Sequence, residues 1–399
     1  MSQELLTGAA DTSRRGFLAG ASVAAIAALG AGGLRPAWAA TDPLADKDGL
    51  TLLGDRPLNA ETPPHLLDDP ITPTNRHFIR NNGLAPEDVD PETWTLTIDG
   101  LVDTPMEMTI AELRENFEVV TRALTLECGG NGRAFFDPPA SGNQWTYGAV
   151  ACSEWTGVRL RDVLMAAGVQ DTVVYTAHYG ADLHLSRDPE RLPISRGVPI
   201  AKAMQDEVLI AFEMNGGPLH PMNGAPLRLV VPGWPGSCSQ KWLTRIELRD
   251  VVHDGPKMTG QSYRVPNRQV APGEAVADED FVIIERMPVK SLITHPATDS
   301  EQPRNFEIRG HAWSGDRWIR QVDISTDFGA TWRTAELHQP VNEAAWQNFR
   351  ADIALPAAGH YEIWARATDS AGEMQPFAID WNPKGYLNNT MHKIAVRVL

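Results

Sequence analysis

The chain has 399 residues, of which 42% are hydrophobic and 22% are charged, as in a folded globular protein rather than a disordered one. This length exceeds that of one ordinary domain, so two or three units are expected. The formal net charge of −16 argues against nucleic acid as a partner and favours a basic protein partner, although solubility alone would also explain it.

The first residues have the pattern of an export signal. A twin-arginine motif, Ser13-Arg14-Arg15-Gly16-Phe17-Leu18, precedes a weakly apolar stretch and the small-x-small site Ala37-Trp38-Ala39. A membrane anchor is the alternative, but the stretch is short and its Ala and Gly residues partition weakly into lipid. We therefore predict a leader over residues 1–39, export of the folded chain to the periplasm, and no stable membrane span.

Regular structure is expected after a linking segment. Residues 40–75 are rich in Pro, Asp and Thr and predict an extended arm on the surface. Residues 93–102 alternate in polarity, which predicts a half-buried strand. Thr109 and Glu112 are spaced as a capping box and predict a short helix.

The next segments mix strands and helices without strict alternation. Residues 122–127 predict a strand that leads into Cys128, and residues 158–167 predict a helix that Gly168 ends. Further strands are predicted at residues 173–175, 208–212, 227–231 and 245–248. This mixture favours an α+β fold over a doubly wound α/β sheet.

The character of the chain changes near residue 280. Beyond it, short alternating segments are separated by turns with almost no helical pattern, which predicts a β-sandwich. The expected organisation is therefore a leader over 1–39, a first domain over 40–280 and a sandwich over 281–399.

Three short clusters carry the candidate chemistry. Cys128 ends a strand and is followed by Gly129, Gly130 and Gly132, so backbone can approach its sulfur closely. Arg133 lies near enough in sequence to favour a thiolate, which would be a nucleophile or a soft-metal ligand. A small buried core residue is the equally open alternative.

The other two clusters suit an anion. Residues 78–83 place Arg80, Asn81 and Asn82 before a glycine turn, where they could bind an anion or form an ordinary surface loop. Residues 223–242 alternate glycine turns with isolated cations, a pattern suited to cradling a phosphorylated cofactor. The cluster over residues 223–242 lacks the spacing of a P-loop or a dinucleotide fingerprint.

Taken together, these stretches resemble the sulfite oxidase family of molybdopterin enzymes. The family order is Phe-x-Arg-Asn, Cys-x-Gly-Asn-x-Arg, Glu-Met-Asn-Gly-x-Pro-Leu, Pro-x-Arg-x-x-x-Pro-Gly and Lys-Trp-Leu. This chain has the five motifs in that order, beginning at Phe78, Cys128, Glu213, Pro226 and Lys241. The resemblance covers about residues 70–399 and implies a molybdopterin-binding domain followed by an immunoglobulin-like dimerisation domain.

The resemblance also implies roles for individual residues. Cys128 matches the thiolate ligand of molybdenum, Arg80 the cation that reads the substrate's charge, and Tyr263 the tyrosine beside the substrate oxygens. The positions that match holders of the cofactor are Arg80, Asn81, Asn82, Cys128, Asp182, Asn223, Arg228, Ser239, Gln240 and Lys241. For Tyr263 an aromatic residue packed at the domain junction is the alternative, and the loop around Asp182 differs from the family.

Two departures bear on the substrate. Animal and plant members have His where this chain has Asn82 and Asn223, so the charge state of these positions no longer responds to pH near neutrality.

The reaction that the resemblance implies is oxygen-atom transfer to sulfur at a molybdenum-molybdopterin cofactor, with two electrons leaving one at a time. The Cys128 loop and the leader favour the SoxC-type sulfane dehydrogenases. Sulfite dehydrogenase is the first alternative, followed by sulfoxide reductase and a non-enzymatic binding protein.

Partners follow from the same resemblance. The chain has no Cys-x-x-Cys-His motif and hence no predicted haem of its own. A dihaem c-type cytochrome subunit is therefore expected to take the electrons, a sulfur-carrier protein to present the substrate, and the C-terminal domain to form a homodimer.

The remaining cysteines and three histidines are not expected to carry the chemistry. Cys152 and Cys238 are interpreted as buried thiols. His178, His184 and His220 are interpreted as ordinary polar contacts, because their spacing matches no metal-ligand pattern.

Overall fold

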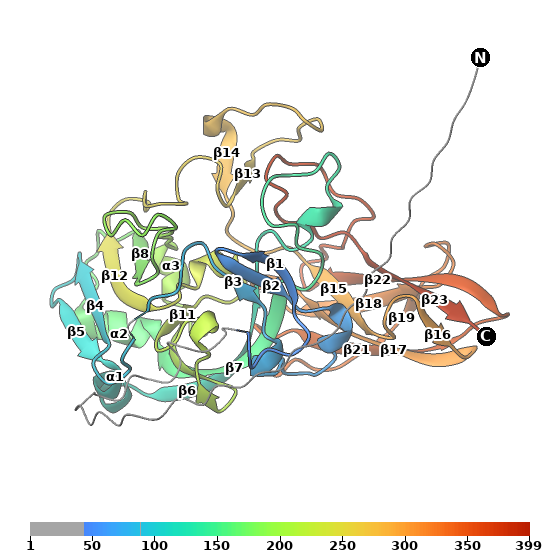
Figure 1. Cartoon of the computed structure of the whole chain (residues 1–399), viewed down its shortest axis with the longest axis horizontal. Helices are drawn as coiled ribbons and strands as arrows, with labels where there is room; N and C mark the ends of the chain where they lie inside the picture. Colours follow the sequence, from blue (N-terminus) through green and yellow to red (C-terminus); the bar gives the residue numbers. More distant parts are fainter. Residues whose placement is uncertain (1–43, 88) are drawn as a thin grey trace, which may run out of the picture. The chain divides into compact units, whose positions relative to one another are not determined.

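The computed structural model describes residues 44–87 and 89–399 (Figure 1). The predicted leader therefore lies outside the described residues. Most of the regular structure is β, with only a few short helices. The helices are α1 (Ile110–Asn116), α2 (Leu160–Ala167) and α3 (Ile200–Ala203).

Among the described residues before residue 285, the strands form four sheets. A three-stranded sheet has the order β1-β2-β3, and a pair joins β13 to β14. A five-stranded sheet has the order β10-β9-β7-β6 with β11 also on β9, and a four-stranded sheet has the order β5-β4-β12-β8. The strands are β1 (Thr51–Asp55), β2 (Leu58–Glu61), β3 (Ile79–Arg80), β4 (Thr95–Gly100), β5 (Met106–Thr109), β6 (Val119–Glu127), β7 (Val150–Arg159), β8 (Tyr175–Gly180), β9 (Leu209–Met214), β10 (Gly217–Pro218), β11 (Arg228–Val230), β12 (Leu243–Arg249), β13 (Arg264–Pro266) and β14 (Phe281–Ile283).

Two further sheets form the C-terminal part, which Figure 1 draws in orange and red. Their orders are β15-β17-β21-β20 and β16-β23-β22-β18-β19. The strands are β15 (Lys290–His295), β16 (Ser300–Gln302), β17 (Asn305–Trp313), β18 (Ile319–Ser325), β19 (Arg333–Thr334), β20 (Glu336–Leu337), β21 (Gln347–Ala354), β22 (Gly359–Asp369) and β23 (His392–Val398). Alternate residues of β21 are buried, and they join residues from both sheets in one apolar core.

The expected helices form, with one change at a boundary. Thr109 caps α1 and exchanges both hydrogen bonds of a capping box with Glu112, as predicted. Gly168 ends α2 in a left-handed conformation, as predicted. The predicted start of α2 at Val158 is wrong, because Val158 continues β7 and pairs with Ile210 of β9.

The prediction of a surface arm over residues 40–75 is only partly right. Strand β1 is mostly exposed, but Ala60 and Glu61 of β2 are buried and β2 pairs with β3. This pairing places the N-terminal segment beside Arg80. The predicted boundary near residue 280 falls between β13 and β14, which pair with each other.

Candidate functional site

One cavity gathers almost all of the predicted site residues. The empty space within it, including the part open to solvent, is about 630 Å³. Of the predicted residues, the lining includes Arg80, Asn82, Cys128, Asp182, Asn223, Arg228, Ser239, Gln240, Lys241 and Tyr263. Asn81 does not line the cavity, but its side-chain oxygen accepts a hydrogen bond from the Lys241 ammonium. Residues separated by up to 183 positions therefore meet in a single site.

Cys128 sits at the end of β6 in a tightly constrained loop. Its amide donates to Ala149 O at 2.9 Å, and its carbonyl accepts from the amide of Asn131 at 2.9 Å. A Cβ at Gly130 would lie 2.4 Å from the Arg133 guanidinium, so the Arg133 side chain would have to move to admit it. The thiol is thus buried, as the alternative interpretation held, and it also faces the cavity.

The cation beside this thiol is Arg80 rather than Arg133. Burial alone would lower the pKa of Arg80, but the neighbouring Tyr263 and a hydrogen bond with Cys128 outweigh burial and raise it. Arg133 instead donates to the carbonyl groups of Lys384 and Asn143. The cation that hydrogen-bonds the Cys128 thiol is thus Arg80, which the sequence had not linked to the thiolate.

Tyr263 points its hydroxyl group at the same end of the cavity. Arg80 Nη2 lies 3.3 Å from the Tyr263 hydroxyl and 2.9 Å from Asn82 Oδ1. The backbone of Tyr263 has φ 52°, a left-handed conformation that costs a non-glycine residue about 1 kcal/mol or more. Its ring is held between the ring of Tyr386 at 5.6 Å and the guanidinium of Arg196 at 4.8 Å.

The rest of the lining carries more positive than negative charge. Burial lowers the pKa of Arg228 to about 9 and that of Lys241 well below its usual value. Asp182 is the acidic residue among the lining residues, and burial raises its pKa to about 6. In the described part of the chain Arg228 and Lys241 form no ion pair with a carboxylate, so the charge of an anionic ligand would offset their desolvation.

Several buried polar atoms in this lining have no partner within the described protein. They include Arg228 Nε, Gln240 Oε1 and Ser237 Oγ. Such atoms are rare in native proteins unless a ligand or water satisfies them. Unpartnered donors and an acceptor, together with the cations, fit a phosphorylated heterocycle with hydrogen-bonding edges. Arg228, Gln240 and Lys241 could hold such a group, with Cys128 as the soft ligand for its metal.

Sequence reasoning missed His77, Ile194 and Met222 in the cavity lining. It also missed three residues that contact the site without lining the cavity. Trp145 is fully buried in the same apolar cluster as Cys128, and its indole N–H has no partner among the described residues. Arg196 is buried, contacts Cys238 Sγ at 3.7 Å and has no carboxylate partner in the described part of the chain. Lys47 donates to Asn223 Oδ1 at 2.8 Å from the N-terminal segment. A lone Trp, Arg or Lys has no sequence signature that would have marked it.

The remaining predictions concern residues outside the site. Cys152 and Cys238 are buried free thiols, as predicted, and burial raises the pKa of Cys152 to about 11. Throughout residues 44–87 and 89–399, no three His, Cys, Asp or Glu side chains are grouped to hold a metal ion. No helix in the described chain is long and apolar enough to cross a bilayer.

Family models match both halves of the chain. A model described as an oxidoreductase molybdopterin binding domain matches residues 82–257. A second, described as a Mo-co oxidoreductase dimerisation domain, matches residues 282–399.

Individual proteins are similar over nearly the whole length. Sulfite oxidase of Gallus gallus is 31% identical over 357 residues, which cover 86% of this chain and 77% of that protein. Mitochondrial sulfite oxidase of Homo sapiens is 33% identical over 391 residues, which cover 91% of this chain and 69% of that protein. The crystal structure of the sulfane dehydrogenase SoxCD from Paracoccus pantotrophus aligns with a TM-score of 0.71 and 29% identity, covering 90% of this chain and 86% of that one.

Proposed function

This chain belongs to the sulfite oxidase family of molybdopterin-dependent oxidoreductases, and we propose that it oxidises carrier-bound sulfane sulfur in the periplasm. A separate dihaem c-type cytochrome subunit takes the electrons in this proposal. The observation that carries the proposal is the likeness to the sulfane dehydrogenase SoxCD over nine-tenths of the chain. The leader motif, which lies outside the described residues, supports export.

The cofactor of the family is molybdenum-molybdopterin, and the cavity supplies the groups that would hold it. When bound, it supplies two-electron oxygen-atom transfer at sulfur. In our proposal Cys128 is the protein ligand of the metal, and Asn82, Asp182, Asn223, Arg228, Ser239, Gln240 and Lys241 hold the pterin and its phosphate. Asn81, which does not line the cavity, would act through its hydrogen bond with Lys241. Lys241 and Arg228 offset phosphate charge at a place where water is largely excluded.

Arg80 and Tyr263 orient the substrate in this proposal. The Arg80 guanidinium lies between the Tyr263 hydroxyl and the Cys128 thiol, so an oxyanion bound there would accept charge-assisted hydrogen bonds beside the metal ligand. The Tyr263 hydroxyl is a second hydrogen-bond donor, and the contacts of its ring with Tyr386 and Arg196 restrict its movement. Fixing the reacting sulfur in one orientation is the main contribution that these two side chains can make.

Free sulfite is the second candidate substrate, favoured by the identity with sulfite oxidases. The two candidates separate when the purified enzyme is given either free sulfite or a carrier protein with a bound sulfane, with reduction of a c-type cytochrome as the readout. We expect fast turnover with the carrier and slow turnover with sulfite. Fast oxidation of sulfite and none of the carrier-bound sulfane would replace the first candidate with the second.

The metal assignment has its own test. The mature protein should contain about one molybdenum per chain, and Cys128→Ser should lower activity by more than about 100-fold, since even residues that only support metal ligands cost 10- to 100-fold. Cys152→Ser is the matched control, because Cys152 is also buried but does not line the cavity. Wild-type protein matured in its own periplasm without molybdenum would exclude the mechanism.

We infer further that the C-terminal sandwich over residues 281–399 is of the immunoglobulin type and forms a homodimer. Its two sheets around one apolar core and the match to a dimerisation domain support this inference. Sedimentation at micromolar concentration tests it, and a monomer there would contradict it.

A further inference from the structure

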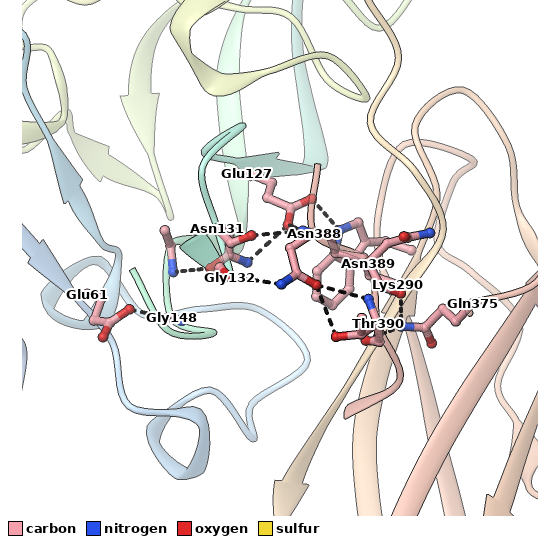
Figure 2. A network of polar contacts seen from close by, with 12 residues as sticks. Glu61, Glu127, Asn131, Gly132, Gly148, Lys290, Gln375, Asn388, Asn389 and Thr390 are labelled. Carbon is pink, nitrogen blue, oxygen red and sulfur yellow. Dashed lines mark hydrogen bonds and ion pairs between the residues drawn. The ribbon is translucent and has the colours of Figure 1, made fainter. Parts of the chain in front are cut away.

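The residue directly before Cys128 is a buried carboxylate that the C-terminal part of the chain holds. Lys290 Nζ of β15 donates to Glu127 Oε1 at 2.5 Å, and Trp313 Nε1 of β17 donates to Glu127 Oε2 at 2.9 Å. The exposed fractions of the Glu127 and Lys290 side chains are 2% and 7%. Figure 2 shows this pair next to Asn131 and Asn388.

Asn131 connects the buried pair to the far side of the Cys128 loop. Its side-chain nitrogen donates to Glu127 Oε1 at 3.0 Å, and its carbonyl accepts from Lys290 Nζ at 3.4 Å. The Asn131 amide in turn donates to the carbonyl of Cys128 at 2.9 Å. The Lys290 ammonium therefore holds the chain both just before Cys128 and three residues after it.

A second segment of the C-terminal part holds the same loop. The amide of Leu387 donates to Gly129 O at 2.9 Å, and Asn388 Nδ2 donates to Gly132 O at 2.9 Å. The neighbouring Tyr386 stacks on Tyr263. The segment thus reaches both the loop of the metal ligand and the tyrosine at the substrate end of the cavity.

These contacts constrain position more than they add stability. A buried ion pair contributes little net stability, because desolvating two charges offsets most of their attraction. However, any position of the loop that separates the Glu127 carboxylate from Lys290 is strongly disfavoured, because it leaves a buried charge unpaired. Metal ligands depend on such supporting contacts, which orient them and restrict their movement.

We propose that Lys290 and Asn388 are positioning residues that set where the Cys128 sulfur lies at the metal. The C-terminal part of the chain is then a component of the metal site as well as a dimerisation domain. The consequence for the enzyme rests on the proposed role of Cys128 as the molybdenum ligand. The constraint on the loop itself is independent of that role.

The test compares Lys290→Met with Lys202→Met in the full chain. Lys202 is a matched control: its side chain is 4% exposed, and it binds Asp316 of the C-terminal part at 2.6 Å. Its ammonium donates to Gln205 and Asp316, and within the described residues it makes no hydrogen bond to the Cys128 loop. Asn388→Ala is a third variant that leaves no buried charge unpaired, so it folds even where Lys290→Met does not.

Two readouts are needed. The first is the rate at which iodoacetamide alkylates Cys128 in the chain prepared without molybdenum, followed by peptide mass spectrometry. The second is the Mo(V) electron paramagnetic resonance signal of the loaded enzyme, together with kcat and KM. We expect Lys290→Met and Asn388→Ala to speed alkylation by about tenfold or more and to shift the Mo(V) signal, with kcat reduced more than KM is raised. Lys202→Met should leave both readouts as in the wild type.

The outcomes distinguish this inference from the proposed function. Equal effects of Lys290→Met and Lys202→Met, or an unchanged alkylation rate in Asn388→Ala, would overturn the positioning role. Faster alkylation in a protein that never binds molybdenum would support the constraint on the loop while contradicting the proposed function.

Discussion

Asp182 is a carboxylate placed among cations in a cavity that keeps water away from it. Its Oδ1 accepts a hydrogen bond from Gln240 at 3.3 Å, which is too little to offset burial. Burial is the largest influence and raises its pKa from 3.8 to about 6, although Lys241 acts in the opposite direction. The folded chain therefore keeps a proton on Asp182 at pH values where the unfolded chain has lost it.

This difference predicts a pH dependence of stability in the cofactor-free chain. A raised folded-state pKa contributes stability that is fully present below pH 3.8 and is lost as pH rises through about 6. The Asp182→Asn variant does not undergo this loss. The free energy of unfolding of the variant minus that of the wild type should therefore increase by about 2–3 kcal/mol from pH 4 to pH 7. Urea unfolding at both pH values measures it. A difference independent of pH would contradict the expectation.

At the scale of elements, the turn before β11 determines where Lys241 can lie. Gly224 has φ 111°, and a Cβ there would be 2.9 Å from both Cβ and Cγ of Lys241. The left-handed backbone and the close approach of Lys241 both require glycine at this position. The turn therefore brings a buried cation against the wall of the cavity.

Gly224→Ala should accordingly harm the site as well as the fold. We expect lower thermal stability and less molybdenum per chain, because Lys241 must move to admit the methyl group. Gly216→Ala is the control: Gly216 has φ 75°, but a Cβ there meets nothing within 4 Å. It should cost about 1 kcal/mol of stability and leave the molybdenum content unchanged. Equal molybdenum contents in the two variants would refute the argument.

At the scale of the whole molecule, the charge of −16 shapes association with other proteins. Long-range attraction speeds the encounter with a partner of opposite charge, and salt screens that attraction within about 10 Å at 0.1 M. In the proposed function this partner is a c-type cytochrome subunit, and its docking face is expected to be basic.

The rate of cytochrome reduction should therefore depend on salt. With the cognate cytochrome well below saturation, we expect the second-order rate constant to fall by about tenfold from 20 mM to 200 mM salt. Saturating cytochrome should remove most of that dependence, because encounter no longer limits turnover. A rate constant that is independent of salt would indicate association driven by apolar contact instead.

Much of the fold and site could be predicted from local patterns. The capping box at Thr109 and the glycine stop at Gly168 depend on a few neighbouring residues, and the structure has both. The segment around Val322 is a strand as predicted, but its polarity pattern did not predict burial, because Asp323 and Ser325 are buried as well. The motifs around Arg80, Cys128 and Lys241 were recognisable because they occur in family order. The cavity brings their side chains together.

What the sequence alone determined is therefore the list of local elements, the family and the chemistry of its cofactor. The tertiary structure decided which charges meet. Val158 stays in a strand because β9 pairs with it, and Arg80 rather than Arg133 lies beside Cys128. Lys290 reaches Glu127 across 163 positions of the chain. Local propensity carries no information about such contacts, because burial and the pairing of distant segments create them.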